Sequence, residues 1–131
     1  MEEISVEWAG RGLEFIGRLG PHETVIDGGA ESGPSPVALL LESTAACMAI
    51  DVVDILGKGR QNLEGLRLKI LAKRMDAPPR YVRAMRFEFE IAGEVEEAKA
   101  ERAVQLSFEK YCSVFHSLRP DIEVESAITF V

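Results

Sequence analysis

The sequence has few of the residues that usually bind nucleic acids or metals. It contains 2 cysteines and 2 histidines, and its 15 Lys and Arg are outnumbered by 22 Asp and Glu, which gives a net charge of −7. Because an acidic chain is repelled by phosphate groups, we expect neither nucleic acid nor a membrane surface among its partners. No CxxC pair is present, so the usual signature of a zinc site is missing and we predict no metal.

The sequence also lacks a long apolar run that is free of charge. A long apolar stretch, SPVALLLESTAACMAIDVVDILG at residues 35–57, carries Glu42, Asp51 and Asp54, which argues against a transmembrane helix. The opening MEEISVEWAG does not match a secretory signal, so we expect a cytoplasmic protein. GGAESG lacks the lysine of a P-loop, and no serine stands in a nucleophile elbow. We therefore expect no bound cofactor.

Length and patterning predict a single α+β domain. A chain of 131 residues that is 47% apolar can bury its own core, so we expect one domain over residues 1–131. Ser35 as N-cap, Pro36 in the first turn and Gly57 at the end predict a helix over the apolar stretch. A second helix is expected over 93–115. Alternating apolar residues predict strands at 4–9, 13–20, 23–29, 63–74, 81–93 and 121–131, in a mainly antiparallel sheet.

The first predicted helix is apolar on most of its faces. A helix of this kind is normally buried on most sides, yet a chain of this size has difficulty covering a helix that is roughly 33 Å long. We therefore expect a long, buried central helix that a homodimer interface helps to cover.

Cys47 lies at the centre of this helix. At about 100° per residue, Ser43, Asp51 and Asp54 fall within roughly 40° of it, which makes a mildly polar stripe. A free cysteine in such a place is commonly a structural core residue. A reactive cysteine needs a thiolate, and therefore positive charge nearby, which the two aspartates oppose. From the residues alone, both roles stay open.

A reactive Cys47 would need an arginine from another part of the fold. The candidates are Arg11, Arg18, Arg80 and Arg119. Arg11, in the tight AGRG turn, is well placed to project from a loop, and the alternative is that it is a solvated turn charge.

Cys112 lies near the end of the second predicted helix, in YCSVFHSLRP. It is either a core residue at a helix end or a thiol that resolves an oxidised Cys47 by forming a disulfide. Cys112 and His116 are also spaced i, i+4, which could make half of a zinc site, but no close second pair accompanies them. Two thiols in a reducing compartment favour redox chemistry or metal binding over a structural disulfide.

Two segments together resemble one known family. SPVALLLESTAACMAIDVVDIL is similar to the central helix of the OsmC/Ohr family, whose members are linked to osmotic induction and organic hydroperoxide resistance. AERAVQLSFEKYCSV resembles the second cysteine segment of that family, 65 residues further on (47 to 112), and GLRLKILAKR matches its connecting hairpin. The resemblance covers nearly the whole chain. IDVVDIL after Cys47 looks most like an uncharacterised OsmC-like branch rather than the peroxidase branch.

The resemblance implies an intertwined homodimer with active sites at the subunit interface. It also implies thiol-dependent reduction of organic hydroperoxides, in oxidative-stress defence. By resemblance, Cys47 is the peroxidatic thiolate that becomes a sulfenic acid, Cys112 condenses with it to a disulfide, and an external dithiol restores both thiols. Arg11 resembles the arginine that stabilises the thiolate and orients the peroxide.

One position departs from the peroxidase branch. That branch has a glutamate just after the helix-starting proline, which holds the arginine, and in this chain Val37 follows Pro36. Glu42 faces away from Cys47 on the helix, whereas Asp51 is a candidate replacement. The rival hypothesis is a non-catalytic or redox-sensing OsmC-like dimer that binds a small apolar ligand at its interface.

Overall fold

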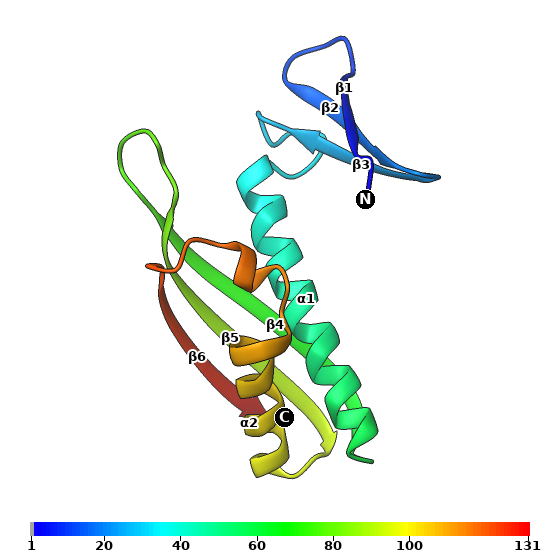
Figure 1. Ribbon diagram of the computed structural model, residues 1–131, viewed down its shortest axis with the longest axis vertical. Helices are drawn as coiled ribbons and strands as arrows, with labels where there is room; N and C mark the ends of the chain where they lie inside the picture. The colour runs from blue at the N-terminus through cyan, green and yellow to red at the C-terminus, as the bar shows by residue number, and fades with distance from the viewer. Residues whose placement is uncertain (1) are drawn as a thin grey trace. The chain divides into compact units, whose positions relative to one another are not determined.

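The computed structural model describes residues 2–131, which form two compact units. The first unit ends at Glu42 and the second begins at Ser43, and each is described by itself. The fold is α+β, as predicted, with two helices and two three-stranded sheets (Figure 1). None of the helices formed by residues 2–131 has the length and apolar character that crossing a bilayer requires. A single domain over residues 1–131 stays a prediction.

The first unit is built on an antiparallel sheet. Its strands are β1 (Ser5–Trp8), β2 (Glu14–Leu19) and β3 (His22–Asp27), hydrogen-bonded in that order. Gly10 and Gly12 have φ values of 89° and 50°, which let the chain turn tightly between β1 and β2. The three strands predicted before residue 30 are thus confirmed.

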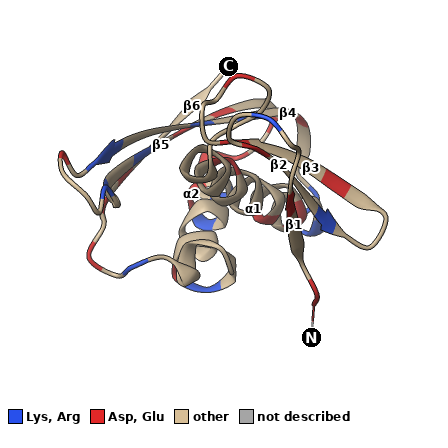
Figure 2. Cartoon of the chain, turned by 90° about the horizontal axis from the view of Figure 1, so that it is seen from above, with Lys and Arg blue, Asp and Glu red and all other residues tan. Residues whose placement is uncertain are grey.

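The second unit combines most of one helix with the second sheet. Along the chain run α1 (Pro36–Lys58), β4 (Asn62–Arg74), β5 (Val82–Glu94), α2 (Glu97–Leu106), a π-helical turn (Ser107–Tyr111), a 3₁₀ turn (Phe115–Ser117) and β6 (Glu123–Phe130). Both helices lie on the same face of the sheet, as Figures 1 and 2 show. The second helix was predicted over 93–115, but regular α-helix covers only α2 (Glu97–Leu106), so the helix is shorter than expected.

The prediction of mainly antiparallel pairing is confirmed, but the strands form two sheets and one pair is parallel. The pairs β1-β2, β2-β3 and β4-β5 are antiparallel, but the closing strand β6 pairs parallel with β5. The reason is the connection between them. The chain leaves β5 through α2, and a helical crossover of this kind brings it back to the starting end of the sheet, so the two strands run in the same direction.

Helix α1 and the second sheet bury facing apolar stripes. On α1, the buried residues are Thr44, Met48, Val52 and Leu56, each four residues from the next and at most 1% exposed. On β5, they are Met85, Phe87, Phe89 and Ile91, each at most 2% exposed. These spacings are the helical and strand periodicities that place side chains on one face.

One part of α1 stays uncovered within the chain. Ile50 is 66% exposed and Val53 is 50% exposed, whereas Cys47, Asp51 and Ile55 are half-buried. A single chain therefore covers the helix only in part, and its cover by a homodimer interface stays a prediction.

The other face of the second sheet carries charges of both signs. Arg86 lies 3.0 Å from Glu88 and 3.0 Å from Glu125, and Lys69 lies 3.5 Å from Glu88. The hydrogen bond between Arg86 and Glu88 raises the pKa of the arginine and lowers the pKa of the glutamate. Exposed ion pairs of this kind contribute little to stability, so this face is a solvated surface with paired charges.

Three phenylalanines join the turns after α2 to the sheet. The ring of Phe87 lies 5.0 Å from Phe108 and 6.2 Å from Phe115, and Phe108 lies 5.2 Å from Phe115, with edge-to-face geometry in each pair. Aromatic pairs of this geometry stabilise beyond the area that they bury. Cys112 lies between Phe108 and Phe115 in the chain, so the cluster holds its segment against the core.

We expect Phe87→Ala to lower the free energy of unfolding by about 3–5 kcal/mol, because it leaves a cavity and removes the ring that both other phenylalanines contact. The measurement is urea-induced unfolding followed by circular dichroism. The matched control is Phe130→Ala, since Phe130 is 37% exposed and should cost clearly less. Equal losses for the two variants would contradict the assignment of Phe87 to the core.

Candidate active site

Helix α1 places Cys47 and Asp51 on one face. The two residues are four apart, one helical turn, so their side chains lie one above the other. Both side chains are partly exposed. The sequence prediction that Asp51 shares a stripe with Cys47 is therefore confirmed, whereas Asp54 forms a surface pair with Lys58 at 2.9 Å.

A widened turn places Cys112. The backbone N–H of Cys112 donates to the carbonyl of Ser107 at 2.9 Å, five residues back, and both side chains are 0% exposed. In an α-helix, residues five apart point about 140° away from each other. The wider hydrogen-bonding ring of a π-turn brings them closer to the same side, and both side chains in this turn reach Asp51.

The site is a group of two thiols and one carboxylate. The Sγ atoms of Cys47 and Cys112 and a carboxylate oxygen of Asp51 all lie within 4.8 Å of one another. The Ser107 hydroxyl donates to Asp51 Oδ2 at 2.8 Å, and the Phe115 N–H donates to Cys112 Sγ at 3.3 Å. Both cysteines are free thiols, and their spacing lets a modest side-chain movement join them as a disulfide.

The two thiols are chemically unequal. Burial raises the pKa of Cys112 to about 12, and the neighbouring Cys47 and Asp51 act in the same direction against the Phe115 N–H. Cys112 is therefore a neutral thiol at pH 7 and a poor nucleophile. Cys47 is the more accessible of the two, since Cys112 is 0% exposed.

Arg11 is held by an acidic cluster in the first unit. Its guanidinium donates to Glu14 Oε2 at 2.9 Å. The Ser32 hydroxyl lies 2.5 Å from Glu14 Oε1 and 3.0 Å from Asp27 Oδ2. Backbone N–H groups of Ser32 and Gly29, with the Ser32 hydroxyl, lower the pKa of Asp27. Glu14 is 8% exposed and Asp27 is 6% exposed, so a buried, hydrogen-bonded acid positions the exposed arginine.

The structure thus brings together two of the three predicted catalytic residues. Cys47 and Cys112 meet in the second unit, while Arg11 belongs to the first unit, and its place beside the thiols stays a prediction. The carboxylate that pairs with Arg11 is that of Glu14, whereas Val37 stands where the resemblance led us to expect a glutamate. Asp51, the candidate replacement for that glutamate, instead accepts a hydrogen bond from Ser107.

The other candidate arginines have partners of their own. Arg18 lies 3.0 Å from Glu7 and 3.4 Å from Glu23. Arg80 donates to the carbonyl of Met75 at 3.1 Å. Arg119 lies 2.6 Å from Asp121 and stacks 3.6 Å from the ring centroid of Tyr81. The hydrogen bond with Asp121 raises the pKa of Arg119, so this arginine is fixed in a separate surface pair.

Sequence reasoning missed Glu14, Ser32 and Ser107. A weak signal existed for Glu14, which stands three residues after Arg11 at the start of a strand, within reach of an ion pair. No comparable signal marks Ser107, because a serine within a helix is usually solvated or bonded to its own backbone.

Together, the two thiols and the Asp51 carboxylate offer three donor atoms to a metal ion. A structural zinc site uses four protein ligands, and His116, the candidate zinc partner of Cys112, is not among the three. We assign no metal to them.

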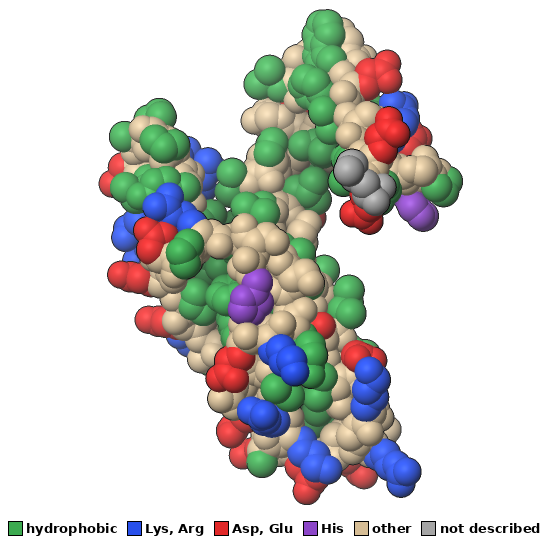
Figure 3. All heavy atoms as spheres, in the orientation of Figure 1, with side chains coloured by type: hydrophobic (Ala, Val, Ile, Leu, Met, Phe, Trp, Pro, Cys, Tyr) green, Lys and Arg blue, Asp and Glu red, His purple; other side chains and the backbone are tan. Residues whose placement is uncertain are grey.

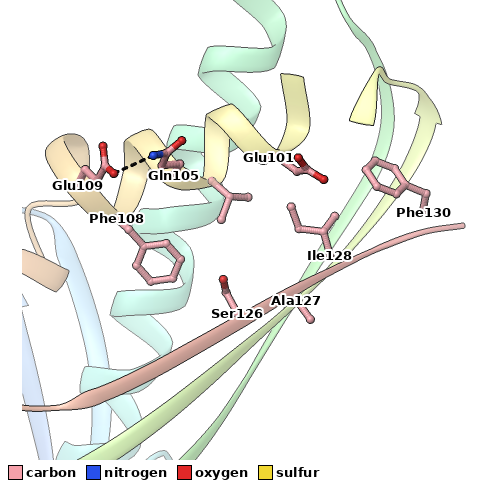
Figure 4. A pocket seen from close by; sticks show the side chains of 9 residues that line it. Glu101, Gln105, Phe108, Glu109, Ser126, Ala127, Ile128 and Phe130 are labelled. Atoms are coloured by element: carbon pink, nitrogen blue, oxygen red, sulfur yellow. Dashed lines mark hydrogen bonds between the residues drawn. The ribbon is translucent and has the colours of Figure 1, made fainter. Parts of the chain in front are cut away.

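A separate hollow of about 450 Å³ lies between α2 and β6 (Figure 4). Glu101 and Phe108 line it from the helical side, and Ser126 and Phe130 line it from the strand. Neither cysteine lines this hollow, so it is not part of the thiol site.

The sequence matches one protein family over most of its length. Residues 28–127 match the family described as OsmC-like protein. The chain belongs to the OsmC-like family. Within this family, it is 36% identical to Protein YhfA of Escherichia coli K12 over 125 residues, which cover 93% of this chain and 92% of that protein. The predicted family is confirmed.

Solved structures share the OsmC-like fold. A hypothetical protein from Aquifex aeolicus is 29% identical with a TM-score of 0.91, covering 100% of this chain and 96% of the other. An organic hydroperoxide resistance protein OsmC from Legionella pneumophila is 14% identical with a TM-score of 0.73, covering 98% and 96%. At the latter identity the similarity concerns the fold alone.

We expect iodoacetamide to alkylate Cys47 at least about tenfold faster than Cys112 near pH 7.5, because Cys112 is buried and neutral. Peptide mass spectrometry over time measures both rates. In denaturant, the same reaction should label the two cysteines at similar rates. Faster labelling of Cys112 in the folded protein would contradict this order of reactivity.

Proposed function

We propose that the protein is a homodimeric, thiol-dependent peroxidase that reduces organic hydroperoxides. The observation that carries this proposal is the pair of unequal thiols within 4.8 Å of each other. A peroxidase that uses two cysteines needs one accessible thiol for the peroxide and a second thiol close enough to resolve it. Cys47 and Cys112 fit these two roles.

The reaction has three balanced steps. The Cys47 thiolate attacks one peroxide oxygen, the O–O bond breaks, and the thiol proton ends on the departing alcohol, which leaves a sulfenic acid at Cys47. Cys112 then attacks Cys47 Sγ, the S–S bond forms and the oxygen leaves as water. An external dithiol reduces this disulfide by thiol–disulfide exchange and is itself oxidised. A reducing, cytoplasmic location is part of the proposal, since turnover needs that dithiol.

Arg11 is the proposed source of positive charge for the Cys47 thiolate. Two of its properties support this role: its side chain is 76% exposed, and Glu14 holds it from one side at 2.9 Å. A guanidinium that is positioned but still accessible can pair with a thiolate and a peroxide oxygen. The thiolate can belong to the same subunit or to the partner subunit.

Uncovered apolar surface supports the homodimer. Within residues 2–42, the buried residues are Glu14, Gly17 and Asp27, so the first sheet has no buried apolar side chain. Trp8, Val6 and Leu13 are each at least 56% exposed, and Figure 3 shows apolar side chains gathered over this unit. A three-stranded sheet needs a covering layer for its apolar face, and a second copy of the chain would supply it.

A second function is favoured by the outer face of α1. A mostly apolar hollow of about 520 Å³ lies there, lined by Ala46, Ala49, Ile50, Val53 and Leu66 together with one acid, Asp54. Apolar hollows of this size take small apolar ligands, and Asp51 opposes a thiolate at Cys47. The alternative is therefore a non-catalytic or redox-sensing dimer that binds a small apolar ligand at its interface.

We expect the purified protein to consume cumene hydroperoxide when a dithiol is supplied, and to consume hydrogen peroxide more slowly. Cys47→Ser should abolish turnover, because it removes the attacking sulfur. Peroxide loss is followed with a colorimetric peroxide assay. After one equivalent of peroxide, mass spectrometry should find a Cys47–Cys112 disulfide.

The matched control for this experiment is Cys112→Ser, which should still react once with peroxide and accumulate a sulfenic acid that dimedone traps. No turnover by the wild type with several dithiols, together with unmodified thiols, would sink the peroxidase proposal and favour the ligand-binding alternative.

We expect the wild type to sediment as a dimer and Ile50→Glu to sediment as a monomer, because an unpaired charge is costly to bury in an apolar interface. Analytical ultracentrifugation measures the mass, and circular dichroism checks the fold. The control is Leu71→Glu, since Leu71 is 48% exposed on the charged face of the second sheet. A wild-type monomer at micromolar concentration would disprove the dimer.

A further inference from the structure

Asp51 is an acid in an unexpected place. It lies within 4.8 Å of two thiols, where its negative charge opposes the thiolates that a peroxidase needs. Its position is nevertheless specified, because Ser107, a residue that is 0% exposed, donates to its Oδ2 atom at 2.8 Å. A carboxylate of this kind has further acceptor capacity beside the bond from Ser107, and one of its oxygens lies within 4.8 Å of both sulfur atoms.

The resolving step requires a base. Cys112 must attack as a thiolate, yet burial raises the pKa of this thiol well above its usual range, so little of it is ionised at pH 7. The titratable groups that surround Cys112 are Cys47 and Asp51. Cys47 is the electrophile in this step, so it cannot accept the proton.

We propose that Asp51 accepts the proton of Cys112 as the disulfide forms, and that Ser107 positions Asp51 for this transfer. Two helices build the arrangement: α1 carries the acceptor beside the electrophilic sulfur, and the π-turn after α2 carries both the nucleophile and the positioning hydroxyl. The inference rests on the proposed function for the sulfenic acid at Cys47, but it applies to any good leaving group on that sulfur.

The step balances in protons and electrons. The Cys112 proton moves to the Asp51 carboxylate, and Cys112 Sγ attacks Cys47 Sγ. The S–S bond forms as the S–O bond of the sulfenic acid breaks. The departing hydroxyl takes the proton back from Asp51 and leaves as water, so the carboxylate is regenerated and the peroxide remains the only oxidant.

A purely electrostatic role for Asp51 predicts the opposite result. The negative charge of Asp51 contributes to the raised pKa of Cys112. If Asp51 were only a neighbouring charge, its removal would create more thiolate and speed the attack by Cys112. If Asp51 accepts the proton, its removal slows the attack, because positioned bases contribute about 10²–10⁴-fold. The sign of the effect therefore separates the two roles.

The test uses 5,5′-dithiobis(2-nitrobenzoate), which contains no peroxide. Cys47 reacts first and releases one thionitrobenzoate, leaving a mixed disulfide. Cys112 then attacks Cys47 Sγ and releases a second thionitrobenzoate, which departs without needing a proton, so the second release reports on removal of the Cys112 proton. Absorbance at 412 nm follows both releases in the full-length protein, and Cys112→Ser, which should give only one release, identifies the second.

We expect Asp51→Asn to slow the second release about 100-fold near pH 7. Its rate should then rise about tenfold per pH unit as hydroxide replaces the lost base, whereas the wild-type rate should change little between about pH 7 and pH 9. An unchanged or faster second release in Asp51→Asn, a wild-type rate that rises tenfold per pH unit, or no second release from the wild type would each overturn the proposal.

Ser107→Ala gives an independent reading if Asp51→Asn fails to fold. This variant keeps the carboxylate but removes the hydrogen bond that positions it, so the second release should slow about tenfold and remain nearly independent of pH. An unchanged rate would overturn the positioning role. A protein without peroxidase turnover that still shows an Asp51-dependent second release would disprove the proposed function and leave this inference standing.

Discussion

The hydrogen bond from Ser107 to Asp51 joins two segments that are 56 residues apart in the chain, at a donor–acceptor distance of 2.8 Å. It locks the π-turn after α2 onto the middle of α1. Because Cys112 follows this turn and Cys47 precedes Asp51 by one helical turn, the same contact sets the spacing of the two thiols. A hydrogen bond to a charged group in a partly buried place is stronger than an average one, so this contact is well suited to fix a reactive geometry.

Packing around this contact creates the chemical difference between the thiols. Cys112 is 0% exposed in the segment that the phenylalanine cluster holds, while Cys47 stays partly exposed on the helix. Two cysteines with the same intrinsic chemistry therefore acquire different roles from solvent access and local charge alone. The arrangement suits a reaction in which an accessible sulfur contacts the substrate and a buried sulfur reacts in a later step.

In the first unit, a network of hydrogen bonds positions Arg11. The resemblance to the peroxidase branch led us to expect a glutamate at the start of the central helix as the partner of the arginine, and in this chain Val37 occupies that position. Glu14 holds Arg11 instead, and Ser32 and Asp27 fix Glu14 in turn. A buried acid with several hydrogen-bond partners is more rigid than a surface ion pair, so the arginine keeps a defined direction without the helical glutamate.

Much of the fold could be predicted from the sequence, because alternation and helical spacing are local signals. The six strands, the helix that begins at Pro36 and the shared face of Cys47 and Asp51 follow from periodicity. The parallel direction of β6 could not be read this way, since it depends on the crossover through α2. The same is true of the helix end, where a π-turn replaces the α-helix that the apolar pattern predicts over 93–115.

By itself, the sequence determined which residues could do the chemistry: two thiols, an acid one turn from the first, and a family pattern that links them. The tertiary structure alone decided how these residues differ and what they touch. The burial of Cys112, the hydrogen bond from Ser32 to Glu14 and the contact between Ser107 and Asp51 all depend on residues that are far apart in the chain. Sequence periodicity shows which residues share one face of a helix or strand. The distances between side chains of different elements, their burial and the charges around them are set only when the elements pack together.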